Sequence, residues 1–91
     1  MVRFRFEPLE PRVVMIAGTR IDRARLAVLE VLEAGGDRRL GELEAAGDRR
    51  GWFAILPSGA RTEFWLPSRK QGAEWLRLAA LAIARRDAGR G

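Results

Sequence analysis

Arginine and tryptophan are the side chains of this chain best suited to recognising a ligand. Lys and Arg total 17, and Lys70 is the only lysine. A guanidinium offers a planar fork of N–H donors that suits phosphate oxygens and guanine edges, and an indole ring stacks on nucleic-acid bases. The pattern therefore indicates contact with nucleic acid. The candidate binding residues are Arg3, Arg5, Arg12, Trp52, Arg61 and Trp65.

The residue types that most enzymes use for catalysis are missing. His and Cys are both absent, which excludes disulfides, zinc sites with thiolate or imidazole ligands, and catalysis by a Cys or a Ser–His pair. The carboxylates of Glu42, Glu44 and Asp48 suit Mg²⁺ in principle, but acids interleaved with arginines are typical of ion-pair partners. We predict no catalytic residue, no metal site and no cofactor, and hence a binding module that is not an enzyme.

The overall charge favours an anionic partner. The 17 basic residues stand against 12 acidic ones, which leaves a net charge of +5. A basic chain attracts anions without specifying which. A GC-rich or thermophilic source would also enrich arginine whatever the function, so the arginine content has both a functional and a genomic interpretation.

Periodicity and capping signals predict the elements that position these residues. Residues 2–17 and 52–66 alternate or are rich in β-branched and aromatic side chains around proline-containing turns, which is typical of hairpins. Each hairpin is followed by a capping box, Thr19 with Asp22 and Ser68 with Gln71. The boxes predict helices over residues 19–34 and 68–86. Residues 36–50 are interpreted as a connector with one short helix.

The two halves correspond when the chain is shifted by 49 residues, because the turn prolines and the capping boxes then align. We therefore expect one domain over residues 1–91, with ββα units at 1–35 and 51–87. The predicted fold class is α+β in the order β-β-α-β-β-α, an antiparallel four-stranded sheet with two helices on one face. The six candidate binding residues would lie on the other face. The expected core-facing strand residues are Phe4, Phe6, Phe53, Ile55, Phe64 and Leu66.

Residues 51–86 resemble the AP2-like DNA-binding module of phage and mobile-element tyrosine integrases. The resemblance rests on a strand that begins at Trp52, on the turn around Gly59, and on the run Gly-Ala-Glu-Trp-Leu over residues 72–76. That family enters the DNA major groove with Arg and Trp side chains of its sheet. The resemblance implies the same role for Trp52, Arg61 and Trp65.

The sequence predicts a small cytoplasmic protein that binds nucleic acid, with DNA favoured over RNA, as a phage or mobile-element regulator would. The alternative is a homodimeric protein-interaction module that docks on a larger protein partner. The helix over residues 68–86 is apolar on several sides, which predicts a homodimer. The longest apolar run, Leu78 to Ala84, is too short to span a membrane.

Overall fold

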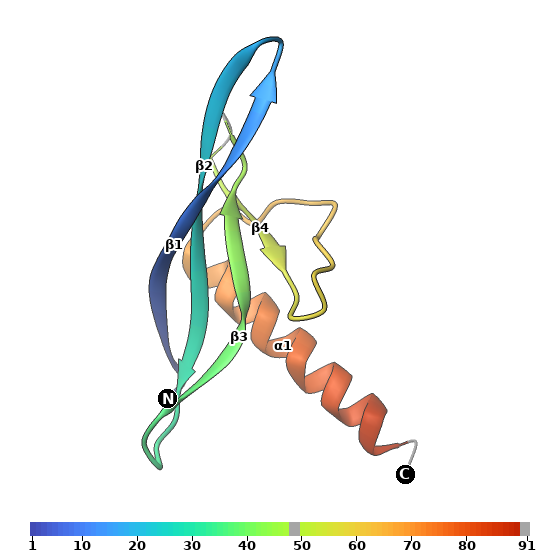
Figure 1. Cartoon of the computed structure of the whole chain (residues 1–91). Helices are drawn as coiled ribbons and strands as arrows, with labels where there is room; N and C mark the ends of the chain where they lie inside the picture. Colours follow the sequence, from blue (N-terminus) through green and yellow to red (C-terminus); the bar gives the residue numbers. More distant parts are fainter. Residues whose placement is uncertain (48–49, 90–91) are drawn as a thin grey trace.

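Four strands form one antiparallel sheet in the order in which they occur in the chain. The computed structural model describes residues 1–47 and 50–89. The strands are β1 (Arg3–Ile16), β2 (Thr19–Val31), β3 (Asp37–Ala45) and β4 (Trp52–Ile55). A helix, α1 (Arg69–Ala88), follows and passes behind the sheet (Figure 1). The fold is therefore α+β, and no described helix is both long enough and apolar enough to cross a bilayer.

The hairpin predicted within residues 2–17 is wrong, because the chain runs through Pro8 and Pro11 as the single strand β1, with only a bulge between Leu9 and Arg12. The helix predicted over residues 19–34 is also wrong, because this segment forms β2. Ala17 and Gly18 have φ values of 49° and 77°. Two successive residues with positive φ make a two-residue hairpin turn, which pairs Ile16 with Thr19. Thr19 therefore begins a strand and does not cap a helix. Charged side chains lie on both faces of β2, where Arg25 pairs with Glu42 of β3 and Glu30 pairs with Arg38 of β3.

The connector predicted over residues 36–50 contains β3 in place of a short helix. β3 pairs with β2 along one edge and with β4 along the other, so its backbone N–H and C=O groups find partners on both sides. A short isolated helix is marginal in water, and this double pairing is more stable. The tandem ββα repeat and the β-β-α-β-β-α order are therefore wrong: within the described residues the fold has a single helix, at its C-terminal end.

The second half of the chain follows the prediction more closely. The helix over residues 68–86 is confirmed as α1, and the Ser68 hydroxyl accepts a hydrogen bond from the Gln71 backbone N–H at 3.1 Å. The strand expected over residues 61–66 is irregular and contacts β4 through two isolated bridges, Trp52 with Leu66 and Ile55 with Arg61. These contacts cover the outer edge of β4, whereas β1 forms the other edge of the sheet.

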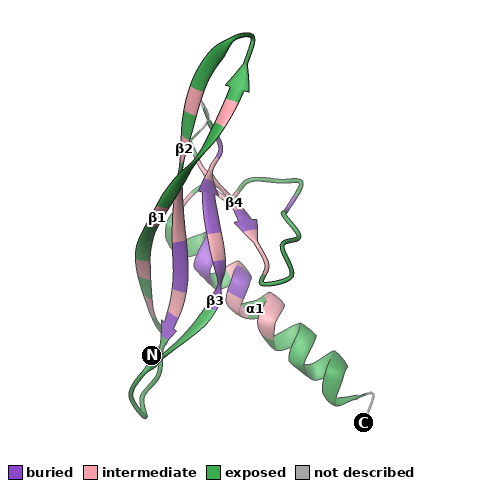
Figure 2. Ribbon diagram, in the orientation of Figure 1, coloured by how far each residue is buried: buried purple, intermediate pink, exposed green. Residues whose placement is uncertain are grey.

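The core lies between α1 and strands β2 to β4. Its fully buried side chains are Val28, Leu40, Leu43, Ala54, Ala73 and Leu76 (Figure 2). Phe4, Phe6 and Leu66 pack against this cluster, as the sequence predicts. β4 is turned over relative to the prediction, because Leu43 pairs with Ala54 and Ala45 pairs with Trp52. Trp52 and Ala54 therefore lie on the α1 side of the sheet. The small side chain of Ala54 allows the helix to approach the sheet closely.

Glu30 connects α1 to the sheet. Its carboxylate accepts a hydrogen bond from Arg38 at 2.6 Å and one from Arg77 of α1 at 3.4 Å. The hydrogen bond from Arg38 lowers the pKa of Glu30. Burial opposes this effect, but the charge of Arg38 and smaller contributions from Arg77 add to the lowering. Glu30 is therefore held in its charged form between two arginines, which stabilises the position of α1.

The distal part of the β1–β2 hairpin projects beyond the rest of the sheet. β3 pairs with β2 only from Arg25 to Val31, so residues 12–23 form a two-stranded arm (Figure 1). Val13, Met15 and Ile16 of this arm are exposed. The arm gives the molecule an elongated shape, with principal extents of 49 × 29 × 20 Å.

Candidate nucleic-acid interface

The sheet face opposite α1 carries most of the candidate residues. We call it the open face, because no described helix or strand packs on it. Strand alternation places Arg3 and Arg5 on this face, opposite to Phe4 and Phe6. A bulge between Leu9 and Arg12 adds one residue to β1. The bulge shifts the alternation, so Arg12 joins the face of Arg3 and Arg5.

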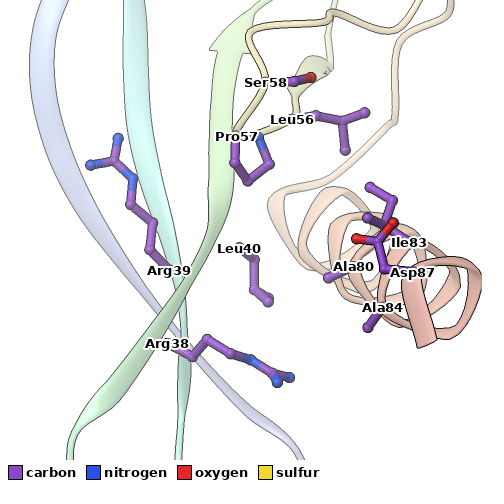
Figure 3. A pocket seen from close by; sticks show the side chains of 10 residues that line it. All are labelled: Arg38, Arg39, Leu40, Leu56, Pro57, Ser58, Ala80, Ile83, Ala84 and Asp87. Carbon is purple, nitrogen blue, oxygen red and sulfur yellow. The ribbon is translucent and has the colours of Figure 1, made fainter. Parts of the chain in front are cut away.

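Arginines outnumber carboxylates on the open face. A second bulge, in β3, turns Arg38 and Leu40 toward α1 and leaves Arg39 pointing away from it (Figure 3). Among the described residues of the face, seven arginines stand against four carboxylates, which leaves an excess of three positive charges. The arginines are Arg3, Arg5, Arg12, Arg23, Arg25, Arg39 and Arg61, and the carboxylates are Glu7, Asp37, Glu42 and Glu44.

Glu44 lies at the centre of this face and is fully buried there. Its Oε1 lies 3.5 Å from Arg12 Nη1, and its Oε2 lies 3.5 Å from Arg61 Nη1. The Arg61 guanidinium also stacks over the Phe53 ring, 4.7 Å from its centroid. Both arginines are about half exposed. They therefore shield the Glu44 carboxylate from water and present donors to the solvent on their outer sides.

The other carboxylates of the open face have arginine partners near the surface. Arg25 forms a short ion pair with Glu42, and Arg39 lies 3.8 Å from the same carboxylate. Arg5 contacts Asp37 at 2.5 Å and Glu7 at 2.8 Å. The Arg5–Glu7 pair is exposed and contributes at most about 1 kcal/mol, whereas the side chains of Glu42 and Asp37 are partly buried. A competing anion can therefore displace the Arg5–Glu7 pair at small cost.

Arg3 and Arg23 have no ion-pair partner among the described residues. Arg23 lies directly opposite Arg12 across the β1–β2 ladder, and like charges in that position repel each other. The Arg23 Nε atom is buried and has no hydrogen-bond acceptor in the described structure. Glu44 Oε2 is likewise buried without a hydrogen-bond partner, and leaving such atoms unpaired is unfavourable.

Five of the six predicted binding residues lie on or beside the open face. Trp65 rests against the Gly51 backbone, where an added Cβ would lie 2.6 Å from the ring. Its neighbours Phe64 and Leu66 contact Trp75 of α1 and the core, respectively, so Trp65 points to the other side and is 41% exposed. Trp52 is the exception, because it packs against the core on the α1 side.

Arg23, Arg25 and Arg39 were not predicted as binding residues, because they lie in segments predicted to be a helix and a connector. The period-two spacing of Arg23 with Arg25, and of Glu42 with Glu44, was the signal that could have found them. Glu42 and Glu44 are ion-pair partners of arginines, as their spacing suggested. Asp48 lies outside the described residues.

Fold and surface together define a small α+β protein, a four-stranded antiparallel meander with one C-terminal helix and an arginine-rich open face. Comparison of the chain with protein-family models, curated proteins and solved structures finds no match.

Proposed function

We propose that this protein binds nucleic acid through phosphate contacts on the open face. The observation that carries the proposal is the arginine cluster, defined as Arg12, Arg23 and Arg61 around the buried Glu44. The cluster contains two arginines directly opposite each other and a buried guanidinium N–H without an acceptor. A phosphate placed against the outer sides of Arg12 and Arg23 would relieve their repulsion.

Trp65 adds a second kind of contact to the proposal. Its ring is 41% exposed and lies against the Gly51 backbone. An exposed aromatic ring of this kind suits stacking on a nucleic-acid base. The resemblance of residues 51–86 to the AP2-like module supports DNA over RNA. A cytoplasmic location agrees with such a role.

The experiment that tests the proposal measures binding at several salt concentrations. Fluorescence anisotropy with labelled single- and double-stranded oligonucleotides is expected to show binding at low salt. The logarithm of affinity should fall linearly with the logarithm of salt concentration, because each phosphate contact releases counterions. An absence of binding at low salt would contradict the proposal, since a chain of net charge +5 is most strongly attracted to DNA under that condition.

The alternative function, a module that docks on a larger protein, is favoured by the arm. Val13, Met15 and Ile16 are 50%, 65% and 48% exposed there, and exposed apolar side chains in one region mark interaction sites. If this alternative is correct, we expect weak binding to nucleic acid that is unchanged when the arginine cluster is neutralised. The salt series therefore separates the two functions.

Glu44→Gln is expected to strengthen nucleic-acid binding. Glu44 competes with phosphate for Arg12 and Arg61, so removing its charge frees both guanidinium groups. We expect a gain of about tenfold at 0.1 M salt, the equivalent of one further phosphate contact. Glu63→Gln is the matched control, because it changes the net charge equally at an exposed position. Unchanged or weaker binding by a folded Glu44→Gln variant would show that Glu44 does not compete with phosphate.

A further inference from the structure

α1 leaves much of its own apolar surface exposed. It packs mainly against β3 and β4, and its buried residues, Gly72, Ala73 and Leu76, all lie in its first half. From Leu81 onward the helix extends away from the sheet and is exposed (Figure 2). Leu78 and Leu81 are 63% and 39% exposed. Two large apolar side chains on one uncovered helical surface indicate an interaction site.

Four exposed residues form a continuous stripe along α1, here called the outer stripe: Glu74, Leu78, Leu81 and Arg85. Their spacing of four, three and four residues places them on one side of a helix. Ala73, Leu76 and Ala80 lie on another side, which faces the sheet and the core. The outer stripe therefore points away from this chain's own core.

The outer stripe is complementary to itself. When two copies of α1 pack antiparallel around a two-fold axis between Leu78 and Leu81, Leu78 of one copy lies opposite Leu81 of the other. The same register places Glu74 opposite Arg85, and the symmetry repeats both pairs. The interface then has an apolar centre with an ion pair of opposite charges at each end.

The sheet also has an uncovered area on this side of α1. A hollow of about 340 Å³ between α1 and β1 is lined by Val2, Phe4, Lys70, Glu74, Arg77 and Leu78. Phe4 is only partly buried and Val2 is exposed. A four-stranded sheet has room for a second helix beside α1, and a helix on the outer stripe would approach this hollow.

We propose that a second copy of this chain packs antiparallel against the outer stripe of α1 and makes the protein a homodimer. The interface lies on the side of the sheet opposite the open face, so dimerisation leaves the open face of each copy free. The proposal is independent of nucleic-acid binding. It is tested by the molar mass of the protein in solution, which distinguishes a dimer from a monomer.

Charge reversal tests the proposed register. Light scattering over a concentration series is expected to give twice the chain mass of 10.2 kDa for the wild type. Glu74→Arg alone and Arg85→Glu alone each place like charges opposite each other, which should raise the dimer dissociation constant at least about tenfold. The double variant Glu74→Arg, Arg85→Glu exchanges the charges of both pairs and should restore dimerisation. Arg86→Glu is the control, because Arg86 is exposed in the same turn but outside the outer stripe.

Circular dichroism checks that each variant remains folded, which is expected because all the substituted positions are exposed. A wild-type mass of 10.2 kDa at every concentration would overturn the proposal and would mean that another molecule covers the outer stripe. A dimer that both single reversals leave intact, or that the double variant does not restore, would overturn the antiparallel register.

Discussion

Leu43→Ala is expected to lower the free energy of unfolding by about 2–5 kcal/mol. Leu43 is fully buried in β3 and belongs to the core cluster. Its side chain presses against Gly72 of α1, where an added Cβ would lie 2.7 Å from Leu43 Cδ2. Truncation removes the main contact between the sheet and the helix at this point and leaves a cavity. Urea denaturation followed by circular dichroism measures the change.

Leu32→Ala is the matched control for this prediction. It is the same substitution at a position that is 37% exposed, after the end of β2. We expect a much smaller loss of stability, because little area is removed from a packed environment. Equal losses in the two variants would show that α1 does not pack on Leu43 as described.

Neutralising the arginine cluster is expected to weaken nucleic-acid binding by roughly 10²–10³-fold at 0.1 M salt, which is about tenfold for each lost phosphate contact. The variant combines Arg12→Gln, Arg23→Gln and Arg61→Gln with Glu44→Gln. The last change is needed because a buried carboxylate without its arginine partners would destabilise the fold. The slope of log affinity against log salt should become shallower by about 2.7 for duplex DNA. Anisotropy titrations measure both quantities.

A control variant with the same change in net charge separates local contacts from overall attraction. Lys70→Gln with Arg86→Gln removes two positive charges from exposed positions of α1, and the cluster variant also lowers the net charge by two. If the site is the open face, the control should retain most of the affinity and the salt slope. Equal losses in both variants would mean that binding follows net charge and that the cluster is not a specific site.

Local signals in the sequence correctly predicted the alternation at the start of β1 and the first turn of α1, but not the course of residues 7–17, where the expected proline turn is part of β1. The alternation of Phe4 and Phe6 with Arg3 and Arg5 correctly separated the core face of β1 from its open face. The Ser68–Gln71 capping box correctly began α1. These elements were predictable because each one depends on contacts within a few residues. The arginines of β1 were identified for the same reason.

The secondary structure of the middle of the chain depends on tertiary contacts. Residues 19–31 and 37–45 show no clean alternation, because charged side chains lie on both faces of β2 and β3. Cross-strand ion pairs such as Arg25–Glu42 and Arg38–Glu30 neutralise those charges, and a partner on another strand cannot be seen in a local period. The capping box predicted at Thr19 does not form, because residues 17–18 make a two-residue hairpin turn and Thr19 begins β2.

By itself, the sequence determined the basic charge, the lack of histidine and cysteine, the alternation at the start of β1 and the C-terminal helix. Only the tertiary structure decided which arginines lie together. A bulge in β1 turns Arg12 onto the open face, and the register of β2 places Arg23 opposite it. Glu44 of β3 forms ion pairs with both Arg12 and Arg61. Bulges and register depend on packing between distant segments, so no local pattern of residues specifies them.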